Sequence, residues 1–67
     1  MNVQVNGEER RVIDSATVDD IVRLLMVQDA RGIAVARNSE IVLRASWTTV
    51  RLEEGDHIEV LQAVQGG

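Results

Sequence analysis

The first residues of the chain alternate between apolar and polar side chains. In "NVQVN", Val3 and Val5 face one way and the polar residues face the other, which is typical of a half-buried strand. Asn6-Gly7 follows, a pair that favours a type I′ hairpin turn because both positions need positive φ. "EERRVID" is then predicted to be the returning strand. Its charged start, residues 8–11, indicates a sheet edge or a solvent-facing segment.

A period of 3.6 residues replaces the alternation in "SATVDDIVRLLMVQDARG". Its apolar positions fall on one helical face, at Val18, Ile21, Val22 and Leu25. Thr17 is the predicted N-cap, and Asp20 three residues later completes an Asp variant of the capping box. Gly32 either ends the helix or lies in the turn after it. The segment therefore predicts one amphipathic helix.

Alternation returns in "GIAVARN", where Ile33, Val35 and Arg37 face one side and the two alanines face the other. Asn38-Ser39 is a predicted turn, and "EIVLR" is a short return strand. "ASWTTV" has no clear period and is expected to form a loop or a single helical turn. Its tryptophan is expected to fill the edge of the core.

"LEEGD" predicts a turn, and "HIEVLQAV" predicts the last strand, with Ile58 and Val60 facing the core. The opposite face carries His57, Glu59, Leu61 and Ala63. Because the last strand has the richest apolar content, we expect it to lie centrally and parallel to the first strand. The prediction is an α+β two-layer domain, with a mixed sheet and one main helix across one face.

Length and composition narrow the possible functions of this domain. A chain of 67 residues allows one domain and leaves little room for a deep active-site cleft beside a core. The chain has no Cys, so thiolate metal sites and disulfides are excluded, and the cytoplasm is the expected compartment. No stretch predicts a signal peptide or a membrane span. The net charge of −4 disfavours nucleic acid as a partner.

The carboxyl end, "VLQAVQGG", raises a separate question, because two glycines contribute nothing to folding. We expect a folded domain over residues 1–64 and a flexible tail over 65–67. One use for such a tail is activation of its carboxylate by ATP. The end must then thread a narrow channel, which favours residues without side chains. Alternatives are a peptide anchor that binds a partner and a merely frayed or truncated end.

The order of elements resembles the ubiquitin-like β-grasp fold. The run "LEEGDHIEVLQAVQGG" is similar to the end of bacterial sulfur carriers of the ThiS type, which serve thiamine (thiazole) biosynthesis. "TVDDIVRLL" and the "NSEIVLR" segment followed by tryptophan are also similar to that family. The resemblance covers essentially the whole chain, and the Gly-Asp turn, apolar strand and Gly-Gly end are its most specific part.

The resemblance implies a carrier and not an enzyme. A ubiquitin-activating-type enzyme would adenylate Gly67, using ATP that this chain does not itself bind. A cysteine desulfurase relay would then supply sulfur, giving a thiocarboxylate that thiazole synthase consumes. Gly66 and Gln65 would thread the channel, and Leu61 and Ala63 would face the partner. No resident cofactor, metal, nucleic acid or membrane is implied.

Two other functions remain open at this stage. The small subunit of molybdopterin synthase resembles this chain in fold and tail, but it often carries Pro-Pro before its final glycines, and this chain has no Pro. A ubiquitin-like modifier or a pure binding module would share the fold. All seven basic residues are Arg, so no Lys side chain could accept an acyl group from another copy.

Overall fold

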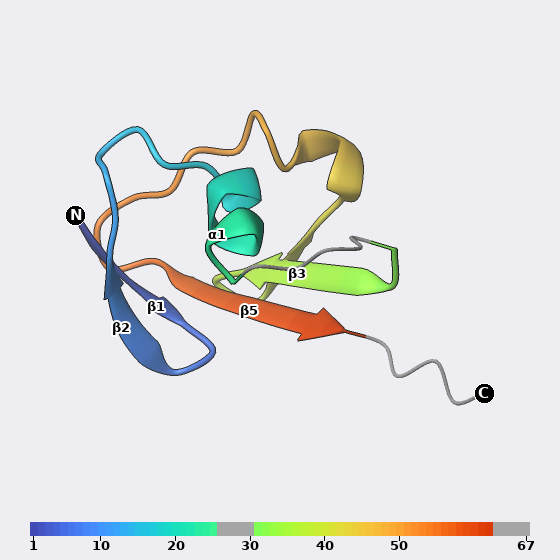
Figure 1. Ribbon diagram of the computed structural model, residues 1–67, viewed down its shortest axis with the longest axis horizontal. Helices are drawn as coiled ribbons and strands as arrows, with labels where there is room; N and C mark the ends of the chain where they lie inside the picture. The colour runs from blue at the N-terminus through green and yellow to red at the C-terminus, as the bar shows by residue number, and fades with distance from the viewer. Residues whose placement is uncertain (26–30, 63–67) are drawn as a thin grey trace.

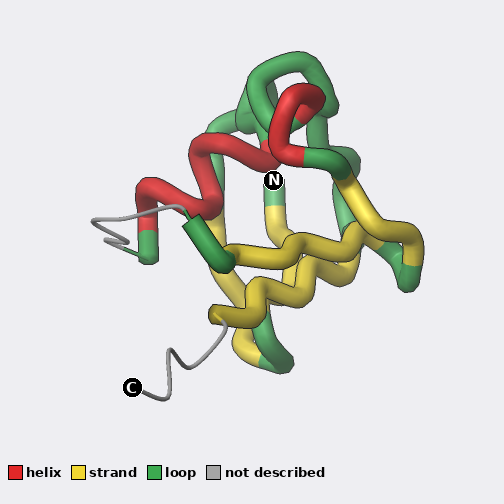
Figure 2. The backbone as a smooth tube through the Cα atoms, turned by 90° about the vertical axis from the view of Figure 1, so that its right-hand side faces the viewer, coloured by secondary structure: helices red, strands yellow, loops and turns green. Residues whose placement is uncertain are grey.

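The computed structural model describes residues 1–25 and 31–62. Within these residues, five strands form one mixed sheet in the order β2-β1-β5-β3-β4. The elements are β1 (Asn2–Val5), β2 (Glu8–Arg11), α1 (Val18–Leu24), β3 (Ile33–Arg37), β4 (Glu40–Val42), the 3-10 helix η1 (Arg44–Ser46) and β5 (His57–Gln62). Figures 1 and 2 show both helical segments on the same side of the sheet. The order and the layers are those of a β-grasp domain, as the sequence predicts.

The first hairpin forms as the alternation predicts, with positive φ of 52° at Asn6 and 83° at Gly7. Strand β2 is shorter than expected and ends at Arg11. Arg11 pairs with Asn2, the first residue of β1, so β1 has no further residue with which a longer β2 could pair. The next residue, Val12, donates one hydrogen bond from its N–H to the Met1 carbonyl (2.8 Å). Strand length is therefore limited here by the partner strand.

Helix α1 starts at the predicted cap. The Thr17 hydroxyl accepts from the Asp20 N–H (3.3 Å), and the Asp20 carboxylate accepts from the Thr17 N–H (2.9 Å). Both halves of the capping box are present, which satisfies two N–H groups that a helix start leaves without partners. The predicted apolar stripe faces the sheet, and its members Val18, Ile21 and Val22 are buried.

Strand β5 lies in the middle of the sheet, parallel to β1 and antiparallel to β3. The core between sheet and helix consists of Val3, Val5, Ala16, Val18, Ile21, Val22, Val35, Trp47, Leu52, Ile58 and Val60. Trp47 is only 3% exposed. Its indole N–H donates to the Val42 carbonyl (3.0 Å), which satisfies the one polar group of the ring. The tryptophan thus fills the core, as expected, and also braces β4.

A buried carboxylate, Asp56, fixes the turn that leads into β5. Its oxygens accept from Arg37 Nε (2.7 Å), Asn38 Nδ2 (2.9 Å) and the Glu53 N–H (2.8 Å). Burial raises the pKa of Asp56, but these three hydrogen bonds and the Arg37 charge outweigh burial and hold that pKa below its usual range. The side-chain oxygen of Asn38, Oδ1, in turn accepts from the His57 N–H (2.9 Å). The β3–β4 turn and the start of β5 are therefore tied together.

Candidate functional site

Most of the residues that the sequence marks as functional lie at the end of the chain. Ala63, Gln65, Gly66 and Gly67 are outside the described residues. Leu61 is described; it lies near the end of β5 and is 64% exposed. The structure therefore shows the surface from which the terminal segment departs.

The end of β5 is held in place by a side chain from the first hairpin. The Asn6 side chain accepts from the Val60 N–H (2.8 Å) and donates to the Val60 carbonyl (3.2 Å). This side chain satisfies the Val60 backbone groups that a further residue of β1 would otherwise bond, because β1 ends at Val5. Asn tolerates the left-handed backbone that Asn6 adopts, with φ of 52°. The local sequence predicts Asn6 only as a turn residue, because this contact spans 54 positions.

The sheet face opposite α1 is divided into two zones. On β1, β2 and the start of β5 it is polar, with Asn2, Gln4, Glu9, Arg11, His57 and Glu59. Along β3, β4 and the end of β5 it is apolar. There Leu61 pairs with Ala34, and Ile41 pairs with Ala36. The predicted split of β5, with Leu61 on the solvent face, is confirmed.

We call the residues Ala34, Ala36, Ile41, Leu43 and Leu61 the apolar face. Ile41 is 69% exposed and Leu43 is 71% exposed. A single exposed leucine is ordinary, but several large apolar side chains together indicate a binding surface. The alternation of β5 predicts Leu61 on this face, but no local pattern in residues 40–44 predicts Ile41 and Leu43, because their placement depends on the register with β3.

The described residues offer little chemistry of their own. No cluster of three or more His, Asp or Glu residues suited to a metal ion occurs among them. His57 is exposed, as expected for a surface residue. No helix in this part of the chain is long and apolar enough to cross a membrane. The unusual ionisable pair, Arg37 and Asp56, is structural, and its hydrogen bond raises the pKa of Arg37.

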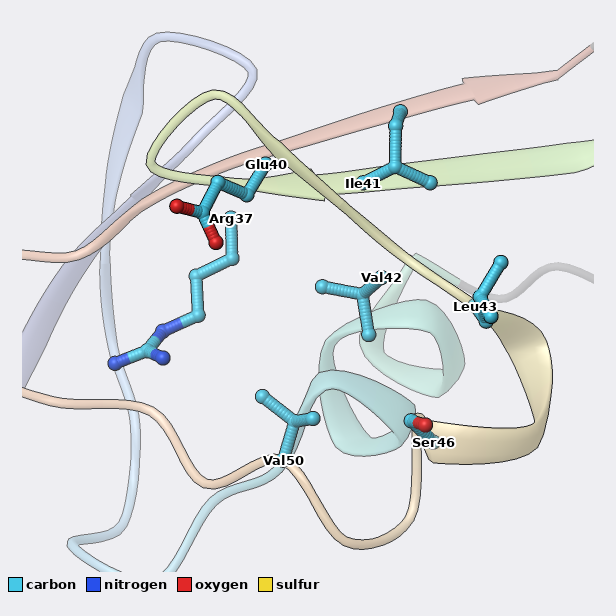
Figure 3. Close-up of a pocket in the computed structure, with 7 residues that line it drawn as sticks. All are labelled: Arg37, Glu40, Ile41, Val42, Leu43, Ser46 and Val50. Atoms are coloured by element: carbon cyan, nitrogen blue, oxygen red, sulfur yellow. The ribbon is translucent and has the colours of Figure 1, made fainter.

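A pocket of about 330 Å³ lies beside β4 and η1 (Figure 3). Its lining residues are Arg37, Glu40, Ile41, Val42, Leu43, Ser46 and Val50. The hydroxyl in this lining, that of Ser46, is not hydrogen-bonded to a base among the described residues.

Comparison with known proteins gives a consistent result. The ThiS family model matches residues 3–67. The crystal structure of a thiamine biosynthesis protein (ThiS) from Geobacter metallireducens is 30% identical, with full coverage of both chains and a TM-score of 0.82. A solution structure of a thiamine biosynthesis protein from that organism is 30% identical with a TM-score of 0.81; the match covers 100% of this chain and 88% of that one.

A third relative is a longer protein. A thiazole synthase of Paramagnetospirillum magneticum is 40% identical over 67 residues, which is 100% of this chain but 20% of the relative. The chain therefore spans one fifth of the length of this curated relative. Since the family model covers nearly the whole chain and the fold agrees with solved members, the chain belongs to the ThiS family of sulfur carriers.

Proposed function

We propose that this chain carries sulfur on its terminal carboxylate and delivers it for thiazole formation in thiamine biosynthesis. The observation that carries the proposal is the family match, which runs through both terminal glycines. The chain acts as a substrate of other enzymes and not as a catalyst. We expect this chemistry in the cytoplasm, where ATP is available.

The chemistry requires two steps at Gly67. A carboxylate oxygen attacks the α-phosphorus of ATP and pyrophosphate leaves, giving an acyl-adenylate. A sulfide then attacks the carbonyl carbon and AMP departs with the carboxylate oxygen, leaving a thiocarboxylate. A carboxylate alone resists such attack, and the adenylate supplies a good leaving group. The sulfur is held on the backbone, so the chain needs no Cys for this role.

The apolar face supports docking to an adenylating enzyme of the ubiquitin-activating type. It lies at the end of β5, next to the departure point of the terminal segment, so a partner seated on it could receive that segment. Ala63 belongs to this docking proposal with Leu61, and Gln65 and Gly66 would thread the partner's channel.

The acceptor of the sulfur is proposed to be a thiazole synthase. The relative from Paramagnetospirillum magneticum bears that name and contains a segment similar to the whole of this chain. A carrier and its acceptor that meet repeatedly would benefit from being joined in one polypeptide, since linkage raises their effective concentration. The named relatives thus favour the thiazole pathway over molybdopterin synthesis. A cysteine desulfurase relay remains the proposed source of the sulfur, with a thiol reductant that releases it from the relay's persulfide as sulfide.

The test is ATP–pyrophosphate exchange catalysed by the adenylating enzyme with this chain as substrate. We expect deletion of Gly67 to abolish exchange. Leu61→Asp should raise the KM at least about tenfold, because a charge would be buried in an apolar contact. The matched control is Ile13→Asp, since Ile13 is also an exposed aliphatic residue (69%) but lies off the apolar face. Unchanged exchange without Gly67 would overturn the proposal; equal effects of the two Asp variants would overturn the docking surface.

A further inference from the structure

The two edges of the sheet differ in how they are protected. Strand β2 forms one edge and consists of Glu8, Glu9, Arg10 and Arg11. Charged edge strands of this kind discourage pairing with other chains. Strand β4 forms the other edge, where the exposed Ile41 and, just past the end of the strand, the exposed Leu43 lie instead. The β4 edge therefore carries one charged residue, Glu40, where the β2 edge carries four.

Backbone groups of β4 point outward from this edge. Val42 pairs with Val35 and Glu40 pairs with Arg37. The Asn38 N–H bonds to the His57 carbonyl, which fixes the alternation along β3 and directs the backbone groups of Val35 and Arg37 toward β4. By the same alternation, the N–H and C=O of Ile41 point away from β3. No described residue bonds to them.

Leu43 continues this open edge. Its backbone is extended, with φ of −62° and ψ of 144°, and its carbonyl accepts from the Ser46 N–H (2.8 Å). Its N–H has no partner among the described residues. Ile41 and Leu43 thus present N–H groups two residues apart along one edge, which is the spacing that an added strand uses. Trp47, bonded to the Val42 carbonyl, holds this edge rigidly.

The pocket beside β4 offers a place for a side chain of such an added strand. Figure 3 shows Val42 and Val50 facing each other, while Ile41 points away to the opposite face of the sheet. Val42 and Val50 are partly buried and contact the core, so the pocket floor is apolar. Successive residues of an added strand would alternate, one toward this pocket and the next toward Ile41 and Leu43.

The negative charge of Glu40, at the rim of the pocket, favours an added strand that carries a basic residue. Glu40 lies on the same face of β4 as Val42, two residues away. It is exposed and makes no salt bridge with another described residue. The other charged residue of the lining, Arg37, attracts Glu40 electrostatically but forms its ion pair with Asp56. A basic residue placed two positions from the residue that enters the pocket would lie beside Glu40. The net charge of −4 also favours a basic partner segment.

From these observations we propose that the outer edge of β4 is a strand-pairing site for an extended, aliphatic segment of a partner protein that carries one basic residue. The backbone of the segment bonds to Ile41 and Leu43. One aliphatic side chain enters the pocket over Val42 and Val50, and the basic residue pairs with Glu40. This site uses the outward backbone groups of Ile41 and Leu43, whose side chains belong to the apolar face, but it does not include the terminal glycines, and its test does not depend on the sulfur chemistry.

The test uses a capped peptide, acetyl-Thr-Lys-Val-Val-Val-Thr-amide, titrated into the ¹⁵N-labelled full chain. We expect the amide signals of Ile41 and Leu43 to shift together and to gain protection from hydrogen exchange. The variant Leu43→Pro removes the outward N–H while fitting the existing φ of −62°. It should weaken peptide binding at least about tenfold, because it leaves the peptide carbonyl without a donor.

Two controls separate strand pairing from other contacts. Leu43→Ala keeps the N–H and should weaken binding no more than about fivefold. A second peptide has Glu in place of Lys. It should bind the natural chain more weakly than the Lys peptide does. The two peptides should bind the Glu40→Gln variant equally well, because that variant has no charge at position 40. Trp47 fluorescence reports whether each variant is folded.

Three results would overturn the proposal. The first is the absence of shifts at Ile41 and Leu43 up to millimolar peptide. The second is an equal loss for Leu43→Pro and Leu43→Ala, which would show that the side chain and not the backbone binds. The third is a concentration-dependent shift of the same amides without peptide, which would assign the edge to a second copy of this chain.

Discussion

Replacing Asp56 with Asn tests whether one buried carboxylate holds the turn into β5. Asp56 is 5% exposed, and its Oδ2 accepts from both Arg37 Nε and the Glu53 N–H, while Oδ1 accepts from Asn38 Nδ2. An Asn keeps the shape but has only one acceptor oxygen. Its NH₂ group must therefore face at least one of these donors.

Neither orientation of the new amide satisfies all three donors. With its oxygen toward Arg37 and Glu53, the amide NH₂ meets the Asn38 NH₂. Asn38 cannot turn over without losing its bond from the His57 N–H. One lost buried hydrogen bond costs about 1–3 kcal/mol, and the loss of charge assistance to Arg37 adds to this. We expect a total of about 2–3 kcal/mol, against roughly 3–10 kcal/mol for the whole domain.

The assay is urea unfolding followed by the fluorescence of Trp47, the sole Trp of the chain and a buried one. At pH 7 the Asp56→Asn variant should lose about 2–3 kcal/mol of unfolding free energy. The control is Glu59→Gln, an exposed carboxylate on β5, which should change the free energy by less than about 0.5 kcal/mol. A change that small for Asp56→Asn would refute the reasoning.

The same measurement against pH gives an independent check. The folded-state pKa of Asp56 is lowered, so its contribution is fully present above the unfolded-state value, about 3.9. That contribution is lost as the pH falls through the folded-state pKa. The natural chain should therefore lose more stability on acidification than Asp56→Asn. Parallel curves for the two proteins would contradict the assignment.

Two further substitutions test the hydrogen bonds between Asn6 and Val60 and the N-cap of α1. Asn6→Ala removes the bridge to Val60 and places a less suitable residue at positive φ, so it should cost about 2 kcal/mol and speed hydrogen exchange at Val60; exchange at the natural rate would show that the bridge is unimportant. Thr17→Ala removes the helix cap and should cost about 1 kcal/mol in urea unfolding. Thr17→Ser, which keeps the hydroxyl, should stay close to the natural chain, and equal losses for both would argue against the cap.

Local patterns in the sequence were sufficient to predict most of the fold. Positive φ at Asn6-Gly7, the Thr17–Asp20 cap and the two faces of β5 are each set by residues within a few positions, and the structure confirms them. The central place of β5 followed from its apolar content and is also confirmed.

The features that sequence did not predict depend on distant partners. The Asp56 cluster joins residues 18 or 19 positions apart, and the bridge from Asn6 to Val60 spans 54. The apolar face depends on the register between β3 and its neighbours, which no local pattern contains. Of the candidate site, Leu61 was placed correctly from the alternation of β5. The roles of Gly66 and Gly67 rest on the family resemblance and remain predictions.

The central claim, that Gly67 carries sulfur, is tested most directly by intact mass. The chain is incubated with ATP, sulfide and the adenylating enzyme, and fragmentation locates any change. The account predicts the mass gain of one sulfur replacing one oxygen, confined to Gly67 and dependent on ATP. An unchanged mass, under conditions in which a known carrier is converted, would contradict it.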